Sequence, residues 1–300
     1  MKRLVQLSIC ICVAGFTFSL FVPVASSEDH DLEVRKDIEF AVNTGVSLKL
    51  DAYLQKGAGP HPLILHIHGG GFVAGDKSGY PRDSIDPFFD AGFSMITVNY
   101  RLAPKYPFPA CIDDVQDAIT YVKNHARELR VDVNRIVLTG ESAGGLIASH
   151  AGAKCRPGNR VAAVIPFYGE HDLVLRSTEN PCTMDGRVEP PPPGGCISGG
   201  LAVFVGFKEV SPANMKVLEA ASAAYQVHKE MPPYLLIHGT RDFGVPFEQS
   251  VAMKEAMNNV GVEAEIVAIV GGGHGGWSKP EWHHYKKTMV EWVKEKLGLR

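Results

Sequence analysis

Gly140-Glu-Ser-Ala-Gly144 is the stretch of sequence that decides how the rest of the chain is arranged. Arg135-Ile-Val-Leu-Thr139 precedes it and Gly145-Leu-Ile-Ala-Ser-His150 follows it, so the five residues lie where a buried strand would pass into a helix. Glycines flank the serine because such a turn is too tight for side chains, and the serine is forced into a strained conformation that exposes its hydroxyl. Such a short string also recurs by chance, so the prediction that Ser142 is a nucleophile depends on the rest of the chain.

Segments typical of buried strands alternate with segments typical of helices along most of the chain. Strands are predicted at 33–43, 46–55, 62–68, 93–100, 161–168, 233–238 and 263–270, and helices over 112–122, 246–260 and 281–297. The first two strands, which flank Asn43-Thr44-Gly45, are predicted to form an antiparallel hairpin at a sheet edge. The alternation predicts an α/β fold with a mostly parallel central sheet, helices on both faces, and ligand sites beyond the carboxyl ends of the strands.

One segment, about 169–214, departs from this alternation and shows no clean period. It contains Glu189-Pro-Pro-Pro-Pro-Gly-Gly195 and Ser198-Gly-Gly200, which are typical of irregular structure. Long irregular segments inside compact folds are usually functional lids or disordered inserts. We therefore predict a cap-like insert over the site, with a passive loop as the alternative.

The N-terminus has the layout of a secretory signal peptide. Lys2-Arg3 precede an apolar run that ends in Ala25-Ser-Ser27. Cleavage there would separate residues 1–27 from a single domain of residues 28–300 and direct the protein to the periplasm or out of the cell. An uncleaved membrane anchor is the alternative, since the run is about long enough to span a bilayer. Gly15 and Pro23 interrupt the run and small residues close it, which favours cleavage over an anchor. Once the signal is removed, we expect no stable membrane insertion.

Four cysteines lie beyond the predicted signal peptide. Cys182 and Cys196 bracket the proline- and glycine-rich part of the insert, and we predict that they form a disulfide, which export would permit. Cys111 and Cys155 lie in apolar helical patterns, which leaves two alternatives, buried free thiols or a second bridge. None of the four has metal-ligand spacing, so no structural zinc is predicted.

Composition and charge narrow the classes of partner. The chain has 300 residues, of which 45% are hydrophobic, enough for a substantial core. Its 30 basic and 33 acidic residues are intermixed and give a formal net charge of -3. Neither a basic face nor an acidic tail is present, so nucleic-acid binding is not expected.

A serine nucleophile needs an imidazole to take its proton and a carboxylate to orient that imidazole. Asp242 follows a predicted strand, in His238-Gly-Thr-Arg-Asp242-Phe-Gly-Val-Pro246, and His274 lies among glycines after the next strand. Because the carboxyl ends of parallel strands meet at one edge of the sheet, Ser142, Asp242 and His274 are predicted to converge there. Such a set is suited to acyl transfer.

Other residues compete for these roles. Asp172 also follows a strand, but it is expected to be a loop residue of the cap. Glu141 adjoins the serine and cannot easily orient the base, so we expect a structural carboxylate. His283 and His284 lie in the predicted C-terminal helix, where a solvated face is the simpler interpretation.

His68-Gly-Gly-Gly-Phe72 follows a central predicted strand. Backbone N–H groups reach a developing oxyanion only where no side chain intervenes, so this glycine run is predicted to form an oxyanion hole together with the Ala143 N–H group. A phosphate loop is excluded because no Lys-Ser/Thr pair directly follows the glycine run, and the spacing of its glycines is not that of a dinucleotide fingerprint. His68 is expected to order the loop rather than to bind a metal.

Several of these motifs together resemble one known family. The chain resembles the α/β-hydrolase esterases of the hormone-sensitive-lipase-like group at five motifs: His68-Gly-Gly-Gly-Phe72, Asn99-Tyr-Arg-Leu-Ala-Pro104, Tyr106-Pro-Phe-Pro-Ala110, Asp113-Asp114 and Gly140-Glu-Ser-Ala-Gly-Gly145. Leu50-Asp-Ala-Tyr53 and Asp242-Phe-Gly-Val-Pro246 are similar to the related acetyl and feruloyl esterases. The resemblance covers about residues 35–297, apart from the insert.

The resemblance implies an α/β-hydrolase fold and a serine carboxylesterase that acts on small-molecule esters, with short, acetyl or feruloyl acyl groups. It implies a catalytic triad of Ser142, Asp242 and His274. It also implies an oxyanion hole formed by the N–H groups of Gly70, Gly71 and Ala143. It implies no cofactor or metal. Tyr100 and Arg101 are expected to be structural, as are Asp113 and Asp114, with Arg101 paired to a carboxylate under the oxyanion loop.

Two departures from the family leave the substrate open. The segment between the predicted signal peptide and Pro62 is too short for the helical cap common in that group, and the 169–214 insert has no counterpart. An amidase, formamidase or peptidase on the same scaffold remains an alternative, as does a non-catalytic binding protein, although such proteins usually lose a triad member. A triglyceride lipase is disfavoured because the insert contains no long apolar helix to act as an interfacial lid.

Overall fold

The computed structural model describes residues 8–13, 16–21, 30–179, 182–184, 187–189, 195–197 and 199–299. The chain divides into two compact units, Met1–Asp31 and Leu32–Arg300. In the smaller unit, β1 (Ser8–Val13) pairs antiparallel with β2 (Phe16–Phe21). The predicted signal peptide falls largely outside the described residues and stays a prediction.

The larger unit is built on one eight-stranded sheet with the order β12-β11-β8-β7-β5-β6-β4-β3. Its strands are β3 (Leu32–Asn43), β4 (Val46–Gln55), β5 (His61–Ile67), β6 (Ser94–Val98), β7 (Val131–Glu141), β8 (Ala163–Phe167), β11 (Tyr234–Gly239) and β12 (Ala264–Ile269). β3 and β4 form an antiparallel hairpin, and β4 also pairs antiparallel with β6. All other neighbours are parallel. The predicted α/β fold and the edge hairpin are therefore confirmed.

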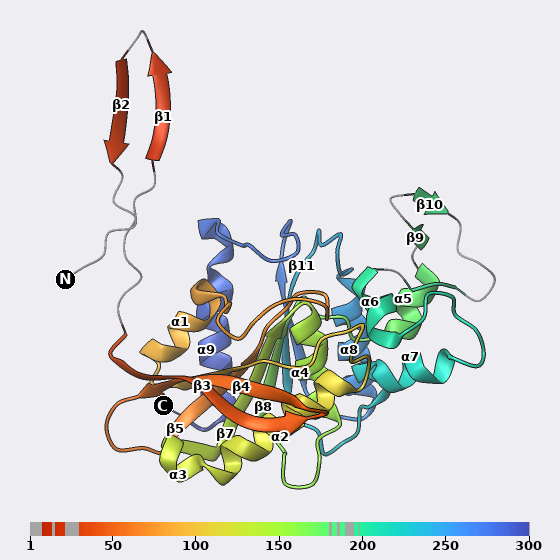
Figure 1. The fold of residues 1–300 in the computed structure, drawn as a ribbon, viewed down its shortest axis with the longest axis horizontal. Coiled ribbons are helices and arrows are strands. Elements are labelled where there is room, and N and C mark those ends of the chain that lie inside the picture. Colours follow the sequence, from red (N-terminus) through yellow and green to blue (C-terminus); the bar gives the residue numbers. More distant parts are fainter. Residues whose placement is uncertain are drawn as a thin grey trace. The chain divides into compact units, whose positions relative to one another are not determined.

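Helices cover both faces of the sheet (Figure 1). Those of the larger unit are α1 (Arg82–Asp90), α2 (Ala110–Asn124), α3 (Ala126–Leu129), α4 (Ala143–Ala153), α5 (Leu173–Glu179), α6 (Gly199–Val205), α7 (Met215–Ala221), α8 (Glu248–Asn259) and α9 (His284–Lys296), with short 3-10 helices η1 (Ala223–Tyr225) and η2 (Pro280–Trp282). Within the described part of the chain, no helix combines the length and the apolar character needed to cross a bilayer.

Two buried clusters lie on opposite faces of the sheet. Along β5, Leu63 and Leu65 belong to the cluster that contains α2, α4 and α8, whereas Ile64 belongs to the cluster that contains α1 and α9. Successive side chains of a strand point to opposite faces, so a continuously apolar strand supplies both cores at once. The central strands of the sheet are therefore buried on both sides, as their unbroken apolar sequences predict.

The 169–214 insert contains helices that the sequence pattern did not predict. α5 and α6 are each seven residues long, and the short strands β9 (Cys182–Met184) and β10 (Arg187–Glu189) pair antiparallel between them. Helices of this length show no clear period, and they form because tertiary packing stabilises them. Phe204 of α6 stacks on Phe72 of the glycine loop, with ring centroids 4.1 Å apart. The insert therefore contacts the loop predicted to bind the oxyanion, although its function as a cap stays a prediction.

The structure shows whether the two cysteines outside the insert are free or bridged. Cys111 is buried in α2, and Cys155 lies just beyond α4; both are free thiols. Of the two alternatives left open by the sequence, the second bridge is therefore wrong. The predicted pairing of Cys182 with Cys196 stays a prediction, because the Cys182 side chain lies outside the described part of the chain.

Arg101 and Asp114 form the buried ion pair expected beneath the oxyanion loop. The Arg101 Nε donates to both carboxylate oxygens at 2.9 Å, Nη2 lies 2.7 Å from Oδ1, and the backbone N–H donates to Oδ2 at 2.8 Å. Asn43 Nδ2 also donates to Asp114, at 2.7 Å, and ties the end of β3 to α2. Two residues further on, the Ala103 N–H donates to the carbonyl of Phe72. The pair therefore anchors the segment on which the glycine loop rests.

We predict that Asp114→Ala lowers the free energy of unfolding by about 3–5 kcal/mol, because the change leaves the Arg101 guanidinium buried without its counter-charge. Urea unfolding followed by circular dichroism measures the loss.

Asp113→Ala is the matched control at the neighbouring position. Asp113 is half-exposed and pairs with the half-exposed Arg156, so its removal should cost less than about 1 kcal/mol. Equal losses in the two variants would contradict the assignment of Asp114 as the anchor.

Candidate active site

Ser142 lies at the sharp turn between β7 and α4, with φ 52° and ψ −117°. This is a conformation that L-residues rarely adopt, and it costs on the order of 1–3 kcal/mol. The turn is possible only because its neighbours lack side chains: a Cβ on Gly140 would collide with the Gly144 carbonyl oxygen, and one on Gly144 with the Ile67 carbonyl oxygen. The Ser142 N–H donates to the Phe167 carbonyl of β8 at 3.0 Å. The serine is thus held at the carboxyl end of the central strands, as predicted.

The three residues predicted from separate segments lie in one hydrogen-bonded chain. His274 Nδ1 is 2.7 Å from Asp242 Oδ2, and His274 Nε2 is 2.9 Å from Ser142 Oγ. With Nδ1 donating to the carboxylate, Nε2 is left to accept the proton of the serine hydroxyl. This is the geometry that a serine nucleophile, its general base and an orienting acid require.

Several groups besides His274 hold the Asp242 carboxylate. The backbone N–H groups of Gly244 and Val245 donate to Oδ1 at 2.8 and 2.9 Å, and His238 Nε2 lies 3.4 Å from Oδ2. Burial by itself would raise the pKa of Asp242, but the bonds from His238, His274 and Val245 outweigh it and hold that pKa well below its usual value. Asp242 is therefore a carboxylate across the neutral range and can stabilise a positive charge on His274.

The glycine loop runs beside Ser142. A Cβ built on Gly69 would lie 3.6 Å from the Ser142 Cβ. Gly70 has φ +112°, and any side chain there would collide with the Ala74 carbonyl, whereas nothing lies within 4 Å of the Cβ position of Gly71. The structure thus brings the predicted oxyanion residues Gly70 and Gly71 to the same edge as Ala143, the first residue of α4. Their function as donors stays a prediction.

Aromatic and polar contacts order this loop from below. His68 Nδ1 lies 2.7 Å from the Gly69 carbonyl, and its ring stacks on Tyr100 with centroids 4.3 Å apart. The Tyr100 hydroxyl donates to the His68 carbonyl at 3.0 Å. These contacts agree with the expectation that His68 orders the loop, and they explain why Tyr100 lies beside it.

A buried charge pair fixes the far end of the same loop. Lys77 Nζ lies 2.9 Å from Asp51 of β4, and both side chains are less than a tenth exposed. The Lys77 N–H donates to the side-chain carbonyl of Asn99, whose amide in turn donates to Asp76 at 3.0 Å. Both ends of the glycine loop are therefore tied to strands of the sheet, which limits its movement around Ser142.

Glu141 lies next to Ser142, and both Glu141 and Tyr168 are half-buried. Burial raises the pKa of Glu141 to about 7, while a hydrogen bond with Tyr168 and the nearby His274 oppose the shift. Its Oε1 has no hydrogen-bond partner among the described residues. The Tyr168 ring lies edge-on to the His274 imidazole, with centroids 4.7 Å apart. Glu141 does not orient the base directly, as expected, but contacts it through Tyr168.

The competing candidates lie elsewhere. Asp172 Oδ1 accepts from the Leu175 N–H at 2.8 Å and so caps the start of α5. His283 and His284 are both exposed. Two residues that touch the predicted triad, Tyr168 and His238, were not predicted from the sequence. Each lies at the end of a strand, a position that could have singled them out, but only the fold shows that they touch the triad.

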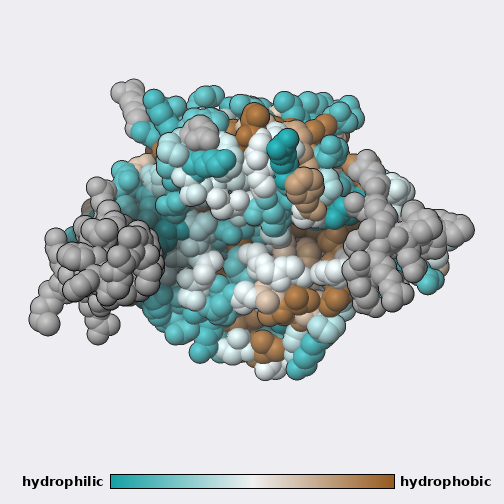
Figure 2. Space-filling model, turned by 90° about the horizontal axis from the view of Figure 1, so that it is seen from above, coloured by the Kyte–Doolittle hydropathy of each residue, from teal (hydrophilic) through white to brown (hydrophobic). Residues whose placement is uncertain are grey.

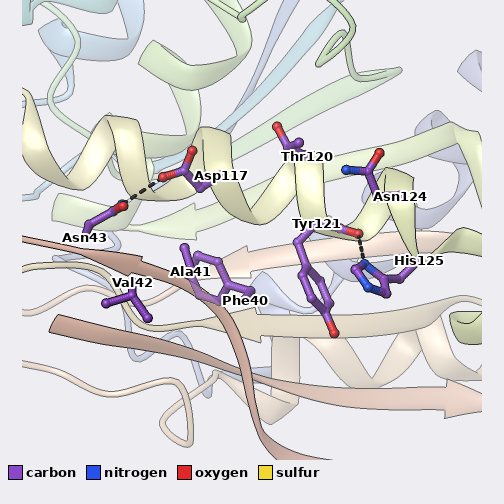
Figure 3. A pocket seen from close by; sticks show the side chains of 9 residues that line it. All are labelled: Phe40, Ala41, Val42, Asn43, Asp117, Thr120, Tyr121, Asn124 and His125. Carbon is purple, nitrogen blue, oxygen red and sulfur yellow. Dashed lines mark hydrogen bonds between the residues drawn. The ribbon is translucent and has the colours of Figure 1, made fainter. Parts of the chain in front are cut away.

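Figure 2 looks on to the edge where the parallel strands end, and shows hydrophobic residues gathered around a hollow in that face. A groove also lies between β3 and α2; Figure 3 shows its lining residues, which include Asn43, Asp117, Tyr121 and His125. None of the predicted site residues lines that groove. Among the described residues, no group of three or more His, Cys, Asp and Glu side chains is placed to hold a metal ion.

The BD-FAE family model matches residues 50–257, more than half of the chain. The chain belongs to the BD-FAE family. This match includes Ser142 and Asp242, whereas His274 lies beyond its end. Family membership confirms the resemblance drawn from the motifs, and the α/β-hydrolase sheet is the fold that it implied.

Two proteins of Mycobacterium tuberculosis illustrate the similarity to curated proteins. The chain is 28% identical over 221 residues to the probable carboxylic ester hydrolase LipM. The alignment covers 70% of this chain and 48% of LipM. It is 27% identical over 234 residues to the esterase LipC, and this alignment covers 72% of this chain and 53% of LipC. The chain thus spans about half the length of these relatives.

Solved structures match the fold over nearly the whole chain. A truncated carbohydrate esterase from gut microbiota has a TM-score of 0.72 and 27% identity, and the match covers 90% of this chain and 98% of that one. The esterase Est2 of Thermogutta terrifontis with bound propionate has a TM-score of 0.66 and 26% identity, covering 89% and 93% of the two chains.

We predict that the stability gained by Glu141→Gln depends on pH. The folded state holds the carboxyl proton more tightly than the unfolded chain, so Glu141 lowers the free energy of unfolding as pH rises from about 4.5 to about 7. The neutral amide avoids this loss, and the variant should gain about 3 kcal/mol over the wild type above pH 7. Thermal unfolding between pH 5 and 8.5 measures the difference.

Glu255→Gln, which removes a carboxylate from the exposed face of α8, is the control variant. A constant difference for Glu141→Gln across the same range would contradict the raised pKa.

Proposed function

We propose that this chain is a serine carboxylesterase that cleaves short-chain acyl esters through an acyl-enzyme intermediate. The observation that carries the proposal is the placement of His274, within hydrogen-bond distance of both Ser142 Oγ and Asp242 Oδ2. The strained turn at Ser142 supports it, because such strain is retained where it exposes a nucleophile.

Acylation begins when Ser142 Oγ attacks the ester carbonyl carbon and His274 Nε2 accepts the hydroxyl proton. Asp242 stabilises the imidazolium that forms, because it is a buried carboxylate bonded to Nδ1. The carbonyl oxygen becomes an oxyanion, for which the N–H groups of Gly70, Gly71 and Ala143 are the proposed donors. When the C–O bond breaks, His274 returns the proton to the departing alcohol.

Deacylation repeats these steps with water as the nucleophile. His274 takes a proton from the water, the hydroxide attacks the acyl carbon, and the proton then passes to Ser142 Oγ as the acid leaves. Every step uses residues of this chain.

The acyl and alcohol groups are proposed from the comparisons. The similar gut structure is named a carbohydrate esterase, and the Thermogutta terrifontis enzyme holds propionate. We therefore propose a short acyl group such as acetyl, carried on a carbohydrate or a simple alcohol. The resemblance of Leu50-Asp-Ala-Tyr53 to feruloyl esterases makes a feruloyl group the alternative.

We also propose that the protein is exported to the periplasm or secreted, on the basis of the N-terminal pattern of charge and hydrophobicity. Export would place Cys182 and Cys196 in an oxidising compartment, where they are proposed to pair.

Ser142→Ala should lower kcat/KM for p-nitrophenyl acetate by at least about 1,000-fold, because the nucleophile is lost while the binding surface stays. Initial rates of nitrophenol release measure the effect. An organophosphate should add to the wild type at Ser142, as seen in the mass of the peptide, and not to the variant.

Ser278→Ala, at an exposed serine, is the control and should keep wild-type rates. Turnover that survives in Ser142→Ala would overturn the proposal. A hydrolysis profile over acyl lengths, feruloyl esters, acetylated sugars and anilides then identifies the leaving group, and preference for anilides would favour the amidase alternative.

A further inference from the structure

Helix α5 of the insert reaches the loop that holds the proposed acid. Arg176 Nη2 donates to the Gly244 carbonyl oxygen at 3.1 Å, and Arg176 Nε donates to Glu170 Oε1 at 3.0 Å. We propose that Arg176 is a positioning residue for the reaction, which acts on Asp242 through the peptide group between Gly244 and Val245. This inference rests on the proposed function.

The Gly244–Val245 peptide group connects the arginine to the acid. Its carbonyl oxygen, that of Gly244, accepts from Arg176, and its N–H, that of Val245, donates to Asp242 Oδ1 at 2.9 Å. A cation on the carbonyl side polarises the amide and strengthens the bond that its N–H donates. Arg176 therefore both holds the plane of this peptide and strengthens its hold on Asp242.

The same loop also touches the base. The Cβ position of Gly244 lies 3.4 Å from His274 Cγ, so this residue packs against the imidazole. A shift of the loop would move the acid and one wall of the base together. Displacements of about 1 Å in such an arrangement can cost about 100-fold in rate.

Glu170 fixes the direction of the arginine. It lies just beyond β8, its side chain is only 6% exposed, and that of Arg176 is 16% exposed. A planar guanidinium donates in fixed directions, so the bond from Nε to Glu170 aims Nη2 at the loop. The arginine is therefore held between the end of β8 and the loop after β11.

α5 itself does not depend on Arg176. Its start is capped by Asp172, and Gln249 Oε1 of α8 accepts from the N–H groups of both His171 and Asp172 at 2.8 Å. Removal of the guanidinium should therefore leave the helix in place and release only the acid loop.

Arg176→Met keeps the apolar stem and removes the donors. We expect kcat for p-nitrophenyl acetate to fall by about 10- to 100-fold with KM changed by less than about twofold, because the loss acts on the base and not on ester binding. Arg176→Lys, which keeps a charged donor, should recover part of the loss. Lys208→Ala, which removes an exposed cation elsewhere in the insert, should keep wild-type kcat.

A double variant shows whether the effect passes through the acid. In an Asp242→Asn background, Arg176→Met should lower kcat by less than about twofold, since residues that act as one unit are not additive. A full further loss in that background would overturn the inference. So would a wild-type kcat in Arg176→Met, or a KM that rises while kcat stays constant.

Failure of the inference is distinguishable from failure of the proposed function. Organophosphate labelling of Ser142 and ester turnover by the wild type test the function alone. If the wild type is active and Arg176→Met matches it, the function stands and the positioning role is wrong.

Discussion

The tight packing of backbone at the turn around Ser142 is the constraint on which the rest of the structure depends. The turn forces a positive φ on a residue with a side chain, and it closes only because Gly140 and Gly144 leave room for neighbouring carbonyls. All eleven residues of α4 are buried, so the helix that follows the serine is fixed in the core. Burial of this helix offsets the strain, and Ser142 is held rigidly at the sheet edge.

The other parts of the site reach this edge on loops, and each loop is restrained by its own buried charges. Lys77 and Asp51 hold the glycine loop, and Asp242 is fixed by backbone donors within its own turn. Loops tolerate change more readily than the elements they connect, yet reacting groups must stay within fractions of an ångström. Buried polar contacts at the loop ends hold the site residues in place, while the rest of each loop can still vary.

The sequence predicted what depends on local pattern and order along the chain. Apolar strands, glycine spacing and the order of Ser142, Asp242 and His274 were sufficient for the sheet and for three residues that the structure brings together. It did not predict α5 and α6, because seven-residue helices show too few turns to display a period. Contacts made across the fold, such as that of Tyr168 with His274, follow from topology and leave no local signal.

The insert is integrated into the site by two kinds of contact. On one side its aromatic ring at Phe204 stacks on Phe72, and on the other Arg176 bonds to Glu170 and to the acid loop. Apolar stacking tolerates changes of shape, whereas a charge-assisted bond of fixed geometry does not. Variation in the α6 part of the insert can therefore alter the surface beside the glycine loop without changing the bonds that Arg176 of α5 makes to Glu170 and to the Gly244 carbonyl.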